Sequence, residues 1–169
     1  MIRKAVPTDA KDITPIHIQC WQEAYAGLLP QSYLDQLDKS YERRLQWWTK
    51  LTTEKDKAVF VAEQENQIIG FAAVEPARDK SMEGYGELTS IYLLKKYHGQ
   101  GIGQALLKMG LNQLKEWNYT KAYCWVLENN PTIKFYEKSG AKFNGTKKSI
   151  ELGGQKLIEL AYVWDDLNK

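Results

Sequence analysis

The residues that most directly suggest chemistry are three alternating glycines, Gly99, Gly101 and Gly103, placed where an apolar strand pattern gives way to a helical one. A glycine-rich turn before a helix exposes backbone N–H groups and directs the positive end of the helix dipole at whatever lies above it. A phosphate is the anion most often bound by such a turn. The sequence therefore predicts a phosphate-binding turn at residues 99–103.

Two familiar phosphate motifs do not match this turn. A P-loop requires Gly-Lys followed by Ser or Thr, and no such tripeptide occurs in the chain. A dinucleotide-binding turn requires a glycine at the sixth position, where this chain has Gln104. It also requires an acidic residue at the end of the next strand, and Trp125 and Val126 stand there instead. A tight strand-to-helix turn without a ligand is the structural alternative.

The stretch His98-Gly-Gln-Gly-Ile-Gly103, followed by Ala-Leu-Leu, resembles the acyl-coenzyme A motif of the GNAT acetyltransferase superfamily. In that family, backbone N–H groups of the turn hold the pyrophosphate, and the pantetheine arm lies like a strand beside the strand that precedes it. The resemblance implies acetyl-coenzyme A as cosubstrate. His98 departs from the pattern, since the family usually has Gln or Arg there. The implied coenzyme-binding residues are Ile91, Tyr92, Leu93, His98, Gly99, Gln100, Gly101, Ile102, Gly103, Asn129 and Tyr136.

A second motif runs from Asn129 to Gly140 and contains Phe135-Tyr136. It resembles the family's downstream Asn…Phe-Tyr…Gly element, with Thr132 where Ala is common. By resemblance, Asn129 hydrogen-bonds the pantetheine arm and Tyr136 is the general acid that protonates the departing thiolate. A phenol with a pKa of about 10 is protonated at neutral pH and can serve a thiol with a pKa near 8.5. Core packing is the alternative for Tyr136.

The implied reaction is direct attack of a primary amine, on a small molecule or a peptide, at the thioester carbonyl. Glu87, near the start of the strand before the glycine turn, is the candidate general base, acting alone or through a water. That role requires burial to raise its pKa. An ordinary strand-edge acid is the alternative. In the family, a backbone N–H near Leu93 usually stabilises the oxyanion.

Aromatic residues of the N-terminal region are expected to wall the acceptor site. The expected residues are Trp21, Tyr25 and Tyr33, with Glu23, Asp35 and Glu87 nearby. Aromatic faces and carboxylates together suit a cationic acceptor, such as a polyamine, an amino-acid derivative or a peptide amine. Trp21 also shares the apolar face of its predicted helix, so it is equally a core residue.

The elements that position these residues follow from changes in the hydrophobic period. For residues 1–57 the pattern predicts a short strand followed by helical segments. The resemblance implies that this region is an acceptor-side arm, which forms one wall of the acceptor site. Residues 58–143 alternate strands with helices, one of them from Gly99 to Trp117, and the resemblance implies that they form the acetyl-coenzyme A-binding core. Residues 144–169 predict a C-terminal hairpin around Gly153-Gly154.

The pattern and the resemblance together predict an α+β (mixed α/β) fold with a single N-acetyltransferase domain over residues 1–169. Its central twisted sheet is expected to have about seven mostly antiparallel strands, to splay at the coenzyme site and to carry helices on both faces.

The composition limits the alternatives. The net charge of the 169 residues is only +2, so a polyanionic partner is not required. Two distant cysteines and the lack of a signal sequence favour a cytoplasmic location, and no segment is apolar enough to span a membrane. No metal site is expected, because His17 and Cys20 have no second pair of ligands. The exposed hairpin makes a homodimer one expectation.

Two other functions compete with the acetyltransferase. A non-catalytic acyl-coenzyme A-binding sensor would use the same fold and the same motifs. A nucleic-acid-binding domain would use the many aromatic residues, but near-neutral charge and the lack of an RNP-type motif argue against it.

Overall fold

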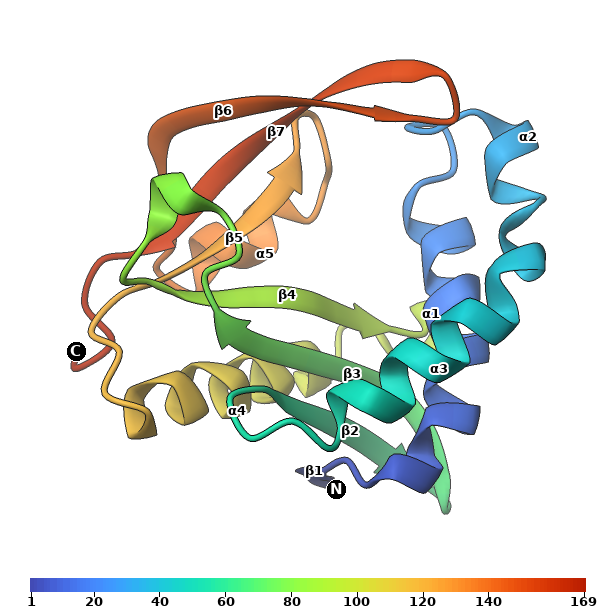
Figure 1. Cartoon of the computed structure of the whole chain (residues 1–169), viewed down its shortest axis with the longest axis horizontal. Helices are drawn as coiled ribbons and strands as arrows, with labels where there is room; N and C mark the ends of the chain where they lie inside the picture. The colour runs from blue at the N-terminus through green and yellow to red at the C-terminus, as the bar shows by residue number, and fades with distance from the viewer.

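The computed structural model describes all residues, 1–169, and organises them around one seven-stranded sheet (Figure 1). The strands are β1 Ile2–Lys4, β2 Ala58–Gln64, β3 Gln67–Pro76, β4 Gly86–Leu93, β5 Ala122–Leu127, β6 Lys142–Leu152 and β7 Gln155–Trp164. Their order across the sheet is β1-β2-β3-β4-β5-β7-β6. Every neighbouring pair is antiparallel except β4 and β5, which confirms the predicted mostly antiparallel sheet.

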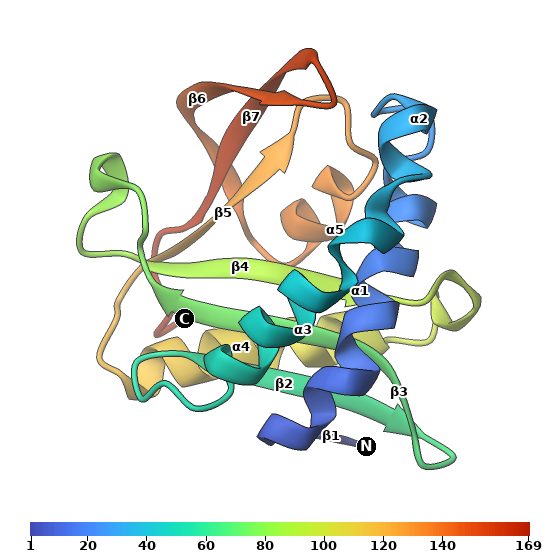
Figure 2. The same cartoon turned by 45° about the vertical axis from the view of Figure 1, so that its right-hand side comes forward.

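Helices cover both faces of the sheet (Figures 1 and 2). The α-helices are α1 Ala10–Ala24, α2 Gln31–Leu34, α3 Tyr41–Leu51, α4 Ile102–Glu116 and α5 Ile133–Lys138; short 3₁₀ turns span Pro7–Asp9, Leu37–Ser40, Lys80–Met82 and Lys95–Tyr97. Along β2, Val59 and Val61 pack into the core under α1 and α3, whereas Phe60 packs into the core under α4. Alternate side chains of a strand point to opposite faces, so the predicted helical layer on each side is confirmed.

Tight two-residue turns close both long hairpins. Glu65 and Asn66 between β2 and β3 have φ of 51° and 62°, and Gly153 and Gly154 between β6 and β7 have φ of 58° and 77°. Turns with two positive φ angles match the twist of the strands that they join. The β6–β7 turn lies against the segment that carries α2, because a Cβ on Gly153 would come within 2.9 Å of the Tyr33 Cβ.

The helix after the glycine turn begins later than the sequence indicates. It starts at Ile102 instead of Gly99, because Gly99 and Gly101 adopt left-handed φ angles of 78° and 81° that an α-helix does not contain. On its inner face Leu106 and Leu107 are buried, whereas Ala105 is exposed. The glycines therefore form a separate turn in front of the helix.

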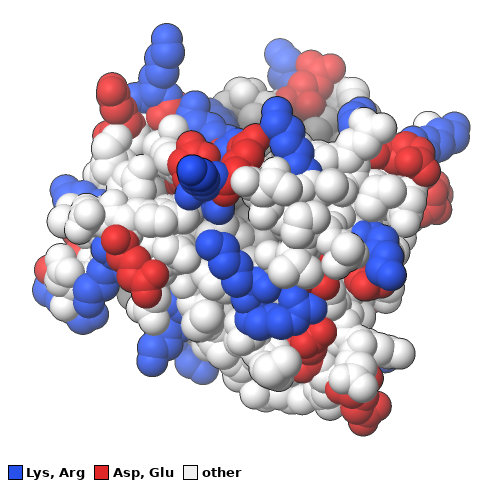
Figure 3. All heavy atoms as spheres, turned by 60° about the horizontal axis from the view of Figure 1, so that its bottom comes forward, with Lys and Arg blue, Asp and Glu red and all other residues white.

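Charges of both signs are interspersed on the surface. On the face that is lower in Figure 1, Lys and Arg side chains lie among Asp and Glu side chains (Figure 3). This distribution matches the small net charge of the chain. None of the helices combines the length and the apolar character that crossing a membrane requires.

Candidate active site

The sheet opens where β4 and β5 meet. These parallel strands pair only at Gly86–Ala122 and Glu87–Tyr123, next to the start of each strand. Beyond those pairs a cavity of about 230 Å³ lies between them, lined by 20 residues from α1, β4, β5, α5, β7 and the adjoining loops. The splay predicted for the coenzyme site is therefore present, and backbone groups of both strands border it.

One wall of the cavity is the outer half of β4. Ile91, Tyr92 and Leu93 line it, together with His98 from the following loop, as the sequence predicts for a coenzyme site. The Nε2 of His98 donates a hydrogen bond to the Leu93 carbonyl, with an N–O distance of 2.8 Å. His98 therefore ties the basic loop back to the end of β4, in the position where the family usually has Gln or Arg.

The glycine turn follows this loop and lies outside the cavity wall. Gly101 precedes the first turn of α4 and has no side chain to cap it, so the N–H groups of residues 102–104 have no partner within the helix. A Cβ added to Gly99 or to Gly101 would meet nothing within 4 Å. The turn therefore presents open backbone and a helix N-terminus, the combination that binds a phosphate or pyrophosphate.

Another wall comes from α5 and from the segment that leads into it. Tyr136 lines the cavity, and burial raises its pKa well above the ordinary value of a tyrosine, so its hydroxyl keeps its proton. Asn130 also lines the cavity, and its Oδ1 accepts a hydrogen bond from the Thr132 N–H. Asn129, the residue expected to contact the pantetheine arm, is exposed with a φ of 69° and is not part of the wall.

The surroundings of Glu87 do not suit the predicted role of general base. Its carboxylate is buried and accepts hydrogen bonds from the Arg78 N–H at 3.0 Å, from Arg78 Nη2 at 2.7 Å and from the Tyr123 hydroxyl at 2.7 Å. Burial alone would raise its pKa, but these hydrogen bonds outweigh burial and lower it. Glu87 does not line the cavity. The requirement for a raised pKa is not met, and the surroundings are those of a structural ion pair.

The structure separates the three aromatic residues expected at the acceptor site. Tyr25 lines the cavity, and its hydroxyl lies 3.0 Å from that of Tyr92. Trp21 packs behind Tyr25, with ring centroids 4.7 Å apart and the Arg44 guanidinium over its ring. Tyr33 lies under the β6–β7 turn. Neither Trp21 nor Tyr33 lines the cavity.

Two cavity residues escape the sequence reasoning. Trp125 on β5 and Glu159 on β7 line the cavity. Burial raises the pKa of Glu159, while Lys148, its cross-strand neighbour, lowers it. The alternation within each strand is visible in the sequence, but the pairing of β5 with β7 is not, so the sequence does not show that both side chains line one cavity.

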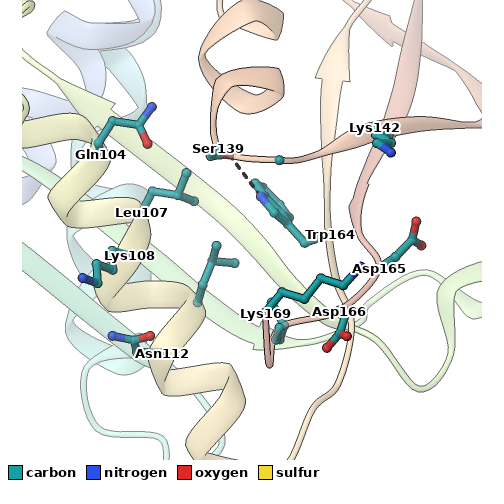
Figure 4. Close-up of a pocket in the computed structure, with 13 residues that line it drawn as sticks. Gln104, Leu107, Lys108, Asn112, Ser139, Lys142, Trp164, Asp165, Asp166 and Lys169 are labelled. Atoms are coloured by element: carbon teal, nitrogen blue, oxygen red, sulfur yellow. Dashed lines mark hydrogen bonds between the residues drawn. The ribbon is translucent and has the colours of Figure 1, made fainter.

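A second and larger hollow, of about 580 Å³, lies alongside α4 from Gln104 to Asn112 (Figure 4). It is lined by polar and charged residues of α4 and of the C-terminal segment, including Lys108, Asn112 and Asp166. Ser139 Oγ accepts a hydrogen bond from Trp164 Nε1 across its edge. None of the residues predicted to bind coenzyme or acceptor lines this hollow, so the smaller cavity between β4 and β5 is the candidate active site.

Comparisons with known proteins agree with this geometry. A family model described as "Acetyltransferase (GNAT) family" matches residues 19–141. The Bacillus subtilis protein "Uncharacterized N-acetyltransferase YuaI" is 35% identical over 170 residues, covering 99% of this chain and 94% of that protein. The spermine/spermidine N(1)-acetyltransferase of B. subtilis is 28% identical over 99 residues, covering 56% of this chain and 63% of that protein.

Solved structures share the fold. The PaiA N-acetyltransferase of Thermoplasma acidophilum, solved in complex with coenzyme A, has a TM-score of 0.75 at 22% identity, covering 95% of this chain and 96% of that chain. The splayed strands, the glycine turn ahead of α4 and the family match thus lead to one assignment. The chain belongs to the GNAT acetyltransferase family and is an acyltransferase.

Proposed function

We propose that this protein transfers the acetyl group of acetyl-coenzyme A directly to a primary amine of a small molecule or a peptide. The observation that carries the proposal is the cavity between β4 and β5, which is lined by Tyr136 together with Tyr25, Trp125 and Glu159. The coenzyme A complex of the similar PaiA structure and the spermine/spermidine activity named for a relative support the two substrates.

The geometry supports an extended coenzyme. Its pantetheine arm would lie along the backbone of Ile91 and Leu93, where β4 has lost its neighbour, and its pyrophosphate would meet the glycine turn. Backbone N–H and C=O groups at an open strand edge are well suited to pair with an amide-containing chain. The coenzyme would thus take the place of a missing strand in the gap.

Tyr136 is the general acid in this proposal. The amine nitrogen attacks the thioester carbonyl carbon, the carbon–sulfur bond breaks, and the departing sulfur takes the proton of the Tyr136 hydroxyl. Since burial raises the pKa of that hydroxyl, it is protonated before each turnover and regains its proton from solvent afterwards. Glu87 is held in an ion pair with Arg78, so the proposal assigns removal of the ammonium proton to water at the acceptor side.

Two measurements test the proposal. Calorimetry should detect acetyl-coenzyme A binding, and thiol-release assays should show coenzyme A formation with at least one amine in a panel of polyamines, amino-acid amides and peptides. A lack of binding at millimolar acetyl-coenzyme A would overturn the proposal. Binding without thiol release for any amine would favour the sensor.

A further inference from the structure

The ammonium of Lys148, on β6, lies among groups that recognise cationic amines. Its Nζ is 4.3 Å from the ring centroid of Trp125, 3.8 Å from Glu159 Oε1 and 3.9 Å from Asp79 Oδ2. An aromatic face combined with carboxylates is a general way to bind an aliphatic ammonium. We call Trp125, Glu159 and Asp79 the ammonium box.

Two members of the box, Trp125 and Glu159, line the candidate active-site cavity. Their strand neighbours Cys124 and Leu160 belong to the core cluster that contains Tyr136, and Cys124 lines the cavity from that side. Because successive side chains of a strand point to opposite faces, Trp125 and Glu159 face away from the Tyr136 side of the sheet. An amine that reached the thioester from the acceptor side would pass the box.

Lys148 is held loosely in the box. Both of its carboxylate distances exceed the 2.7–3.2 Å range of an N–H···O hydrogen bond. By contrast, Arg78 Nη2 and Glu87 Oε2, on the same side of the sheet, are 2.7 Å apart. The Lys148 side chain is 37% exposed and that of Glu159 is 19% exposed, so the lysine can swing into solvent while the carboxylate stays.

We propose that the ammonium box binds the distal ammonium of an aliphatic diamine or polyamine acceptor, and that Lys148 occupies the box until the acceptor displaces it. The inference rests on the proposed function and names the acceptor class of the same site. A lysine side chain is a primary ammonium on a four-carbon apolar stem. An α,ω-diamine reproduces that charge and stem at its far end, whereas a monoamine leaves the box to Lys148.

Glu159→Gln tests the binding half of the proposal. Steady-state thiol release is measured with a series of α,ω-diaminoalkanes and with the monoamines of matching length. We expect the KM for diamines to rise by about tenfold, the equivalent of one lost charge contact, and the KM for monoamines to stay within about twofold. Equal changes for the two series, or no change, would overturn the proposal.

Lys148→Met tests the displacement half. Methionine keeps an apolar stem over Trp125 and removes the competing charge, so the KM for diamines should fall by several-fold with kcat unchanged. Lys147→Met is the matched control, because Lys147 is the preceding residue on β6 and pairs instead with Glu128 at 3.8 Å, away from the cavity. A KM for diamines that is unchanged or higher in Lys148→Met contradicts displacement.

Binding is also measured without turnover. A diamine is titrated by calorimetry into the protein saturated with coenzyme A, for the wild type and for Glu159→Gln. If acetyl-coenzyme A binds and no amine releases thiol, the proposed transfer fails, and a diamine affinity lost in Glu159→Gln still supports the box. If amines are acetylated but diamine affinity is equal in both proteins, the box alone is wrong.

Discussion

Glu87 and Glu159 are two enclosed carboxylates on one side of the sheet, and their partners give them opposite properties. Glu87 accepts three hydrogen bonds of 3.0 Å or less from Arg78 and Tyr123, and its pKa is lowered. Glu159 has only the loose contact with Lys148, and burial raises its pKa. The residue that the sequence favours as a base therefore has the surroundings of a structural residue, and Glu159 is the carboxylate of the two that lines the cavity.

Glu87→Gln should therefore affect stability more than proton transfer. We expect a loss of about 1–2 kcal/mol in the free energy of unfolding at neutral pH, limited by the exposure of Arg78. The lowered pKa makes this stabilisation fully present above the ordinary value of 4.5 and lost as the pH falls through the folded value, so the gap between wild type and variant should close in acid. Urea denaturation of both proteins at several pH values measures this difference in the free energy of unfolding.

The pH profile of activity distinguishes a structural role of Glu87, in the ion pair with Arg78, from the predicted role of general base. In the acetylation assay, Glu87→Gln should keep the acidic limb of kcat/KM, because its carboxylate is outside the cavity. Disappearance of that limb would restore Glu87 as the base. Glu128→Gln, a surface acid with a single lysine contact, serves as the control for charge alone.

Tyr136→Phe should lower kcat by about 100-fold, the usual contribution of a positioned general acid, and leave acetyl-coenzyme A affinity within about twofold. The ring keeps its packing in the core, so the folded state should survive. Tyr162→Phe, another buried tyrosine of the same core that does not line the cavity, should leave kcat unchanged. A wild-type kcat in Tyr136→Phe would remove this residue as the acid.

Sequence motifs located Tyr136 because its neighbours in the chain carry the signal. They could not locate Glu159, whose position depends on β7 lying between β5 and β6. They also could not separate Tyr25, which reaches the cavity, from Trp21 one helical turn earlier, because that difference depends on how far the C-terminal end of α1 extends along the cavity. Local patterns thus predict side-chain identity, and long-range pairing decides which side chains meet.

At the scale of elements, the turn before α4 shows why glycine is needed at specific positions. Gly99 and Gly101 have left-handed φ angles, although a Cβ at either position would have open space around it. Gly103 has an ordinary backbone, but its Cβ would approach the Phe135 ring to 3.2 Å. Glycine is therefore needed for two reasons. Gly99 and Gly101 allow the left-handed backbone conformation, and Gly103 allows α4 to pack closely on α5.

Gly101→Ala should weaken acetyl-coenzyme A binding by about tenfold, because a left-handed alanine costs about 1–2 kcal/mol and relaxation would turn the N–H groups away. Gly145→Ala in β6 is the matched control, with a φ of 91° and equally open space but no part in the site. Both variants should lose similar stability in thermal unfolding, and only Gly101→Ala should lose affinity in calorimetry. Equal affinities would mean that the turn does not hold the coenzyme.

The element types were predictable from the sequence, and some of their limits were not. The helical period and the two-residue turns mark most strands and helices along the chain. The start of α4 was misplaced by three residues, because glycine permits both a helix and a left-handed turn. The buried face of α4 also includes Gly110, which packs so closely that a Cβ there would lie 3.0 Å from Val74, a contact that hydrophobicity alone does not reveal.

At the scale of the whole molecule, the seven strands, the mixed sheet and the two helical layers were predictable, because each follows from the order of elements and from the family resemblance. The exact place of β6 at the sheet edge was not, since it depends on the C-terminal hairpin inserting β7 beside β5. The cavity exists because of this arrangement: β7 supports β5 on one side and leaves its other side open toward β4.

Coenzyme binding should accordingly stabilise the whole fold. At a ligand concentration 100 times the Kd, mass action adds about 2.7 kcal/mol to the free energy of unfolding. Hydrogen exchange followed by mass spectrometry should show the strongest added protection in residues 88–93 and 124–127, which border the gap. Protection confined to the C-terminal segment 164–169 would instead place the coenzyme in the larger hollow.

The short pairing of β4 with β5 has a mechanical consequence. Strands β1–β4 form one half of the sheet and strands β5–β7 the other. Only two residue pairs, both between β4 and β5, join the two halves within the sheet. Gly86 belongs to one of these pairs, and a Cβ there would lie 2.6 Å from Leu114 of α4. The helix α4 therefore packs closely against the junction of the two halves. Under a pulling force the two halves should separate first between β4 and β5. A coenzyme bound between these strands would contact both halves and raise the unfolding force.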